Sequence, residues 1–300
     1  MQVSRIRKLA SIGRKLASIG SGAALAIAGI AVTTSPAEAL GDVQASAWAP
    51  AGNAKIRPGV QMYTDGAQCT GNFVFKDRAG NVYVGYAAHC AGTGAATETD
   101  VCDAKSLPIG TRVRFASDSS LVSAGTTVGR GRLAYSSWLT MQRLGTKRSN
   151  VCAYNDFALV RVGARHVKKV NPSVPFWGGP VGLDTNGSAA GDDVFSYGNS
   201  SLRGGVEQLS PKQGTSLGST GNGWTHPVYT LAPGIPGDSG SGFLDAQGRA
   251  LGVLSTLAIA PFPASNGVGD LSSELTFARE HSGIPGLHLV KGTTPFHQTL

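Results

Sequence analysis

Charged and aromatic side chains are scarce in this 300-residue chain: Asp, Glu, Lys and Arg make up 15% of it, and Phe, Trp and Tyr make up 7%. Hydrophobic residues still reach 41%, which is enough to fill the core of one or two domains, so the chain is not a disordered tail. Glycine is abundant instead, with 42 residues, about twice the usual share, and it indicates many turns in place of long helices. This composition excludes a helix bundle.

The apolar run near the N-terminus, residues 20–32, is too short and too rich in Gly and Ala to cross a membrane comfortably. It follows a segment, residues 1–19, that carries five basic residues and no acidic one. The small-x-small sequence Ala37-Glu38-Ala39 comes soon after it, and the whole pattern is typical of a secretory signal peptide. We predict cleavage after Ala39 and an extracellular mature protein without stable membrane association.

The positive charge of the chain lies partly in this N-terminal segment. Removing residues 1–39 takes away five of the 26 basic and one of the 18 acidic residues, which lowers the formal net charge from +8 to +4. The remaining basic residues are scattered in turn-rich stretches, and no basic stripe interleaved with aromatic residues is present. A nucleic acid is therefore not an expected partner.

Cysteine is also scarce, since the chain contains only Cys69, Cys90, Cys102 and Cys152. An even number of cysteines in an exported protein indicates disulfides, and four cysteines allow three pairings. We expect the pairs Cys69–Cys90 and Cys102–Cys152. Each would stabilise the fold by about 3–4 kcal/mol in the chain-entropy model.

No metal or cofactor is expected. The cysteines near His89 show no C-x-x-C spacing, and the histidines show no H-x-x-x-H spacing, so the sequence disfavours a zinc site. The acidic residues Glu98, Asp100 and Asp103 match no calcium-ligand pattern, and a solvated loop explains them better.

Short runs of β-branched and aromatic residues, separated by turn signals, dominate the chain from residue 59 onward. The runs at 72–75 and 82–86 flank a turn and predict a β-hairpin. Further runs occur at 111–115, 157–162, 193–197, 227–231, 241–244, 250–255 and 287–290. One helix is predicted late in the chain, capped by Asp270 or Ser272 and stopped near Gly283.

The Pro- and Gly-rich stretch at 170–182 separates two β-units of similar size, which fits two barrels or a pair of sandwiches. Residues 40–58 show little periodicity and are predicted to form a linker or a short pro-segment.

Two short motifs contain a candidate base and its partner. In AAHC (87–90), His89 follows a predicted strand and precedes Cys90, whose disulfide would hold the backbone still. In NDFALV (155–160), Asp156 stands at the start of an apolar strand. A carboxylate buried away from water there needs a hydrogen-bonding partner, such as the N–H of an imidazole. Alone, each residue is explained at least as well by a structural role.

A third motif, PGDSGSG at 236–242, contains a candidate nucleophile. Glycines on both sides of Asp-Ser leave the hydroxyl of Ser239 accessible. The same turn can direct the N–H groups of Gly237 and Ser239 toward one point, where they would form an oxyanion hole. Its position after the His and Asp motifs strengthens the interpretation.

The three motifs, in this order, resemble those of the chymotrypsin-like (trypsin-fold) serine peptidases, in particular the secreted bacterial members, over roughly residues 59–290. The resemblance implies an all-β fold of two antiparallel six-stranded β-barrels with a short C-terminal helix. It implies a secreted, monomeric endopeptidase that acts on proteins or peptides through an acyl-enzyme. His89 would be the general base and then acid, Asp156 its orienting carboxylate, and Ser239 the nucleophile.

The expected organisation follows from the resemblance. The signal peptide would cover 1–39, the linker 40–58, the peptidase domain 59–290 and a tail 291–300. Within the domain, barrel 1 would span about 59–169, barrel 2 about 181–268 and the helix about 270–281. A new N-terminal amine at Ile56 pairing with Asp238, as in zymogen activation, is not expected.

The sequence departs from the family where specificity is set. Pro233 stands six residues before Ser239, where trypsin-type members keep an acid, so cleavage after Lys or Arg is not expected. The pocket wall is predicted to be Ser255-Thr256-Leu257, and Leu257 would narrow the pocket. We expect small or apolar residues on the acyl side of the cleaved bond, the P1 position.

Two other functions remain as alternatives. One is a non-catalytic binding protein on the same fold, which a missing triad residue would have favoured. The other is an α/β-hydrolase, because Ser239 is followed by Asp245, Asp270, His281 and His288. The G-x-S-x-G elbow fails, since Ser241 occupies the place of the second glycine, and regular strand–helix alternation is missing.

Overall fold

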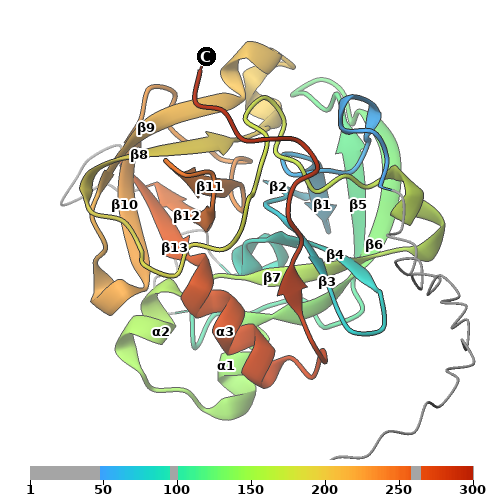
Figure 1. The fold of residues 1–300 in the computed structure, drawn as a ribbon. Helices are drawn as coiled ribbons and strands as arrows, with labels where there is room; N and C mark the ends of the chain where they lie inside the picture. The colour runs from blue at the N-terminus through green and yellow to red at the C-terminus, as the bar shows by residue number, and fades with distance from the viewer. Residues whose placement is uncertain (1–47, 95–100, 258–264, 300) are drawn as a thin grey trace, which may run out of the picture. The chain divides into compact units, whose positions relative to one another are not determined.

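The fold was analysed in a computed structural model, which describes residues 48–94, 101–257 and 265–299. The predicted signal peptide lies outside these residues. No helix in the described part of the chain is long and apolar enough to span a membrane. Strands form two antiparallel sheets, with a helix near the C-terminus (Figure 1), so the predicted all-β class is confirmed.

The first sheet contains eight strands in the order β14-β3-β4-β7-β6-β5-β1-β2. They are β1 (Gln61–Thr64), β2 (Ala67–Thr70), β3 (Val74–Lys76), β4 (Val82–Tyr86), β5 (Arg112–Ser117), β6 (Thr126–Ser136), β7 (Ala158–Val162) and β14 (His288–Leu289). Eight strands replace the predicted six for two reasons. The C-terminal strand β14 pairs with β3, and residues 71–73, which belong to no strand, separate β2 from β3. Because β2 is one edge strand and β3 lies next to the other, this short connection keeps the two edges close together.

The second sheet is a closed barrel of six strands, as predicted, in the order β10-β13-β12-β11-β8-β9. They are β8 (Ala190–Tyr197), β9 (Pro211–Leu217), β10 (Thr225–Thr230), β11 (Gly242–Asp245), β12 (Ala250–Leu257) and β13 (Asn266–Asp270). Its interior is apolar and is filled by Val194, Val228, Phe243, Leu251, Leu254 and Val268.

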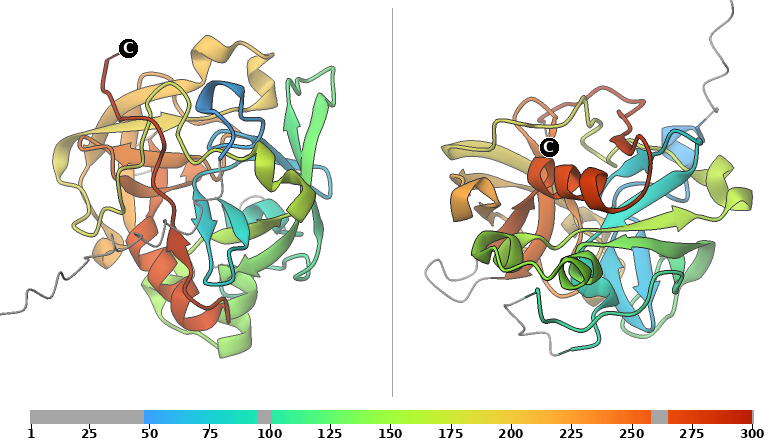
Figure 2. Two further views of the ribbon diagram at one scale, coloured as in Figure 1. Left: turned by 45° about the vertical axis from the view of Figure 1, so that its right-hand side comes forward. Right: turned by 90° about the horizontal axis from the view of Figure 1, so that it is seen from below.

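The predicted late helix is α3 (Leu271–His281), and the side chain of Asp270 caps it by accepting the N–H of Ser273 at 2.7 Å. Two helices that the sequence did not predict, α1 (Ser137–Leu144) and α2 (Ser149–Tyr154), precede β7, and α1 packs against α3 (Figure 2). Short 3₁₀ turns are η1 (Ala51–Asn53), η2 (Ala88–Ala91), η3 (Ala164–Lys169), η4 (Ser201–Arg203), η5 (Glu207–Leu209) and η6 (Gly221–Gly223).

Covalent and packing contacts hold the connecting segments in place. Both expected disulfides, Cys69–Cys90 and Cys102–Cys152, are present. Ile56 is fully buried, and Trp177 in the stretch between the two sheets donates from Nε1 to Ser196 O at 2.7 Å. The first disulfide lies at the end of β4, beside the candidate base.

Candidate active site

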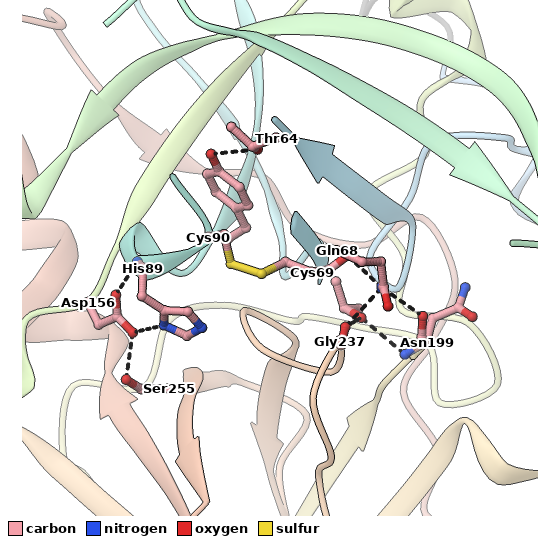
Figure 3. Close-up of a disulfide and its surroundings, with 11 residues drawn as sticks. Thr64, Gln68, Cys69, His89, Cys90, Asp156, Asn199, Gly237 and Ser255 are labelled. Carbon is pink, nitrogen blue, oxygen red and sulfur yellow. Dashed lines mark hydrogen bonds and ion pairs between the residues drawn. A yellow bond between two sulfur atoms is a disulfide. The ribbon is translucent and has the colours of Figure 1, made fainter. Parts of the chain in front are cut away.

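His89 and Asp156 meet because they extend two paired strands at the same end. Strand β4 runs into η2, which carries His89, while Asp156 precedes β7, the antiparallel partner of β4. One Asp156 oxygen accepts the His89 backbone N–H at 2.8 Å, and the other lies 2.6 Å from His89 Nδ1 (Figure 3). The short contact assigns a proton to Nδ1 and leaves Nε2 free to accept one.

The Asp156 carboxylate is almost fully buried, with 3% of the residue exposed, and it has a further donor. Ser255 Oγ donates to Asp156 Oδ2 at 2.6 Å, so this predicted pocket residue contacts the carboxylate (Figure 3). Burial of the His89 ring lowers its pKa, but the Asp156 charge and hydrogen bond outweigh burial, and the pKa is raised above its ordinary value. The Asp156 carboxylate therefore stabilises the protonated, positively charged form of the His89 ring.

Glu274 lies behind Asp156, on α3, and no motif in the sequence assigned it a role at the site. It is fully buried, its Oε1 accepts the Asp156 backbone N–H at 3.0 Å, and its Oε2 has no partner among the described residues. Burial, together with the charges of Asp156 and Asp270, raises the pKa of Glu274 well above its usual range. A neutral Glu274 keeps a second negative charge away from Asp156.

The turn that carries Ser239 packs against the main chain leading into His89. Thr70 N donates to Ser239 O at 2.8 Å, and Thr70 adjoins the disulfide whose other cysteine follows His89. A Cβ at Gly240, where φ is +87°, would lie 2.7 Å from Ala87 N, so this close approach requires glycine. Ser239 is half-buried, and its hydroxyl makes no hydrogen bond to any residue that the structure describes.

The two predicted oxyanion donors are free within the described part of the chain. Neither Gly237 N–H nor Ser239 N–H has an acceptor there, whereas the intervening Asp238 N–H donates to Ile235 O at 2.9 Å. Gly237 has φ +96°, a conformation that favours glycine. Two N–H groups of one turn are thus available to an oxygen atom of a ligand.

Asp238 anchors this turn inside the protein. Its fully buried carboxylate lies 2.7 Å from Arg203 Nη2 and 3.1 Å from Lys212 Nζ. Lys212 is also fully buried, and burial lowers its pKa although Asp238 opposes the shift. The backbone nitrogen of Ile56 donates to Lys169 O at 3.1 Å and does not bind Asp238, whose charge is balanced by Arg203 and Lys212. The sequence did not predict either cation.

The predicted pocket residues come from two segments, one that contains Pro233 and one at the end of β12. Pro233 is exposed, and its carbonyl accepts a hydrogen bond from Arg203 Nη2 at 2.9 Å. Thr256 is exposed, and Leu257 is the last residue of β12. The residue that joins their segments is Asn266, which the sequence analysis missed.

Asn266 is buried, with 1% of its surface exposed, and its side chain bridges the two segments that hold the predicted pocket residues. Its Oδ1 accepts Gly234 N–H at 2.7 Å, and its Nδ2 donates to Gly234 O and Thr256 O, both at 3.3 Å. A Cβ at Gly234 would lie 2.7 Å from Leu254 Cδ2, so the segment of Gly234 packs closely against β12.

The site does not suit a metal. The sulfurs of Cys69 and Cys90 lie with a His89 nitrogen within 4.8 Å of one another, but the sulfurs are bonded to each other. A disulfide sulfur carries no thiolate to bind a metal ion.

No protein-family model matches the chain. No curated protein matches it either.

Several solved structures are similar to the chain. Protease A of Thermobifida fusca is 17% identical, with a TM-score of 0.46, and the match covers 79% of this chain and 99% of that one. A glutamic acid-specific serine protease that uses a histidine triad in substrate binding is 18% identical, with a TM-score of 0.45 and coverage of 78% and 100%. The chymotrypsin of Cellulomonas bogoriensis is 16% identical, with a TM-score of 0.42 and coverage of 78% and 98%. The chain is thus similar, at low identity, to solved structures of bacterial serine proteases.

Proposed function

We propose that this protein is an exported serine endopeptidase that hydrolyses peptide bonds through an acyl-enzyme at Ser239. One observation carries the proposal: Asp156 binds both the ring and the backbone of His89, while the turn of Ser239 packs beside them with two N–H groups that have no acceptor among the described residues. This arrangement provides a base, an orienting carboxylate and oxyanion donors next to an accessible hydroxyl.

The chemistry would run in two halves. Ser239 Oγ attacks the carbonyl carbon of the substrate while His89 Nε2 takes its proton, and Asp156 stabilises the imidazolium. The N–H groups of Gly237 and Ser239 bind the negative oxygen of the tetrahedral intermediate. His89 then protonates the leaving amine, and water, activated by the same ring, releases the acyl group from Ser239.

Export is supported by the N-terminal sequence pattern of residues 1–39 and by two disulfides, which form in oxidising compartments. A binding protein without activity on the same fold is the competing function. The presence of an accessible serine and a paired histidine favours the enzyme.

The test of this proposal is covalent labelling of the secreted protein with a fluorophosphonate, followed by peptide mapping. We expect one adduct, on Ser239, and none in Ser239→Ala. In His89→Ala, labelling should slow by on the order of 10²–10⁴-fold, because the general base is lost. An adduct elsewhere, or an unchanged rate in His89→Ala, would contradict the triad, and no adduct at all would favour the binding protein.

Asn266 gives the proposed enzyme a preference for small P1 residues such as Ala. We expect peptide anilides with Ala at P1 to be cleaved with a kcat/KM about 10–200-fold above those with Phe, since a pocket distinguishes side chains by roughly this factor. Asn266→Gly removes the bridge between Gly234 and Thr256 and should reduce this ratio at least tenfold. The control is Asn171→Gly, which removes another buried Asn, bonded to Ala49 O at 2.7 Å, and should leave the ratio unchanged. Equal ratios in wild type and Asn266→Gly would reject this role.

A further inference from the structure

Ser200 fixes the peptide bond that presents the first proposed oxyanion donor. Its Oγ donates to Pro236 O at 2.6 Å and is itself held by the N–H of Leu202 at 3.1 Å. A trans peptide is planar, with its N–H pointing opposite to its C=O. Holding Pro236 O therefore also sets the direction of the Gly237 N–H, away from Ser200.

The carbonyl on the other side of Gly237 is held from the first sheet. Gly237 O accepts hydrogen bonds from Gln68 Nε2 at 3.0 Å and from Thr70 Oγ1 at 2.8 Å (Figure 3). A Cβ at Gly237 would overlap both Gln68 and Ser200. The glycine is thus enclosed by the side chains that bind its two flanking carbonyls.

The Gln68 amide is itself fixed in orientation. Its Oε1 accepts Ser201 N–H at 3.0 Å, and its Nε2 also lies 3.2 Å from Asn199 O and 3.0 Å from Cys69 O (Figure 3). Because an N–H faces one end of the amide and carbonyls face the other, only one orientation satisfies the contacts. Gln68 therefore joins β2 to both the loop at 199–201 and the turn of Ser239.

We propose that Gln68 and Ser200 are positioning residues, which hold the Gly237 N–H in the direction needed to bind the oxyanion. This inference rests on the proposed peptidase function and adds two residues that no motif marks. Neither side chain touches the reacting atoms. Both act through the carbonyls on either side of Gly237, so their loss should weaken binding of the transition state while leaving substrate binding in place.

The experiment compares Gln68→Met, Ser200→Ala and the double variant in the full mature protein. We expect kcat, per active site titrated, to fall about 10–100-fold in each single variant, because small misplacement of a catalytic group costs up to about 100-fold. KM should change less than about threefold, and the inhibition constant of a peptide aldehyde should rise by the factor by which kcat/KM falls. Ser200→Thr, which keeps the hydroxyl, should restore most of the activity.

Matched controls separate this role from a general loss of stability. Ser282 Oγ accepts the N–H of Ile284 at 3.1 Å, the same local bond that Ser200 makes with Leu202, but in the loop after α3. Ser282→Ala therefore removes this local bond alone and should leave kcat and aldehyde binding unchanged. Gln247→Met, in the turn between β11 and β12, is the corresponding control for Gln68→Met and should also leave both unchanged.

Two results would overturn the proposal. One is a double variant whose kcat and aldehyde affinity stay within about twofold of wild type. The other is a fall that Ser282→Ala reproduces. If the wild type forms no adduct at Ser239, the peptidase function fails instead, and amide hydrogen exchange at 237–240 still tests whether Gln68 and Ser200 hold this turn. Exchange should be faster in the double variant, and unchanged exchange would reject the proposal.

Discussion

Asp156→Asn is expected to lower kcat by about 10⁴-fold while the protein remains folded and secreted. The carboxylate accepts three hydrogen bonds, from the His89 backbone, the His89 ring and Ser255 Oγ. An amide at this place presents an N–H₂ to at least one of these donors, which favours the tautomer in which His89 Nε2 carries the proton. A base protonated at Nε2 cannot accept the proton of Ser239.

The pH profile gives a second readout of the same change. Asp156 raises the pKa of His89 above its ordinary value, and the free base is the active form, so kcat/KM of the wild type should rise as pH passes this raised pKa. With the negative charge removed, the acidic limb of the residual activity should move to lower pH.

Asp77→Asn provides a control. Asp77 lies in the turn after β3, is also buried, and accepts hydrogen bonds from the side chains of Asn81 and Tyr83. Its activity and pH profile should match those of the wild type. Residual activity above about a tenth of wild type in Asp156→Asn would contradict the assigned role.

Asp238→Asn is expected to reduce the free energy of unfolding by about 3–5 kcal/mol, because it leaves two cations buried without their counter-charge. Lys212 is fully buried and the side chain of Arg203 is 10% exposed, so neither regains its hydration without movement of the chain. The same carboxylate accepts the N–H groups of Ser200 and Ile235, so activity should fall as the turn of Ser239 loosens. Urea unfolding and active-site titration measure the two effects.

Lys212→Met is the matched variant for this prediction. It removes one of the two cations and leaves Asp238 paired with Arg203, so its cost should be clearly smaller. In the double variant, Asp238→Asn should cost less than in the wild-type background, because one unpaired charge is gone. Additive losses in the double variant would show that Lys212 and Asp238 are not energetically coupled.

The sequence was a good guide to local structure. Alternating runs predicted the β3–β4 hairpin and the strand β14, and a capping pattern at Asp270 predicted α3. Both disulfides were also expected correctly. These features depend on residues close in sequence or on very few cysteines, and such signals survive without knowledge of the fold.

Contacts between distant segments were missed. The sequence shows no local pattern for the pairing of β14 with β3 or for the bonds of Asn266 to Gly234. The helices α1 and α2 were not predicted either. Ser255 was predicted only as the first residue of the pocket-wall stretch Ser255-Thr256-Leu257, and the bond from its hydroxyl to Asp156 was not foreseen. A strand residue can point to either face, and only the register of the folded barrel decides which neighbour it meets.

The sequence by itself determined the class of fold and the three motifs that contain His89, Asp156 and Ser239, and it limited the disulfides to three pairings. The tertiary structure alone decided what surrounds them: Glu274 behind Asp156, two buried cations on Asp238, and the side chains that hold both carbonyls beside Gly237. The reason is physical. Motifs place reactive groups on the chain, whereas burial, charge and direction depend on segments tens to more than a hundred residues apart that only folding brings together.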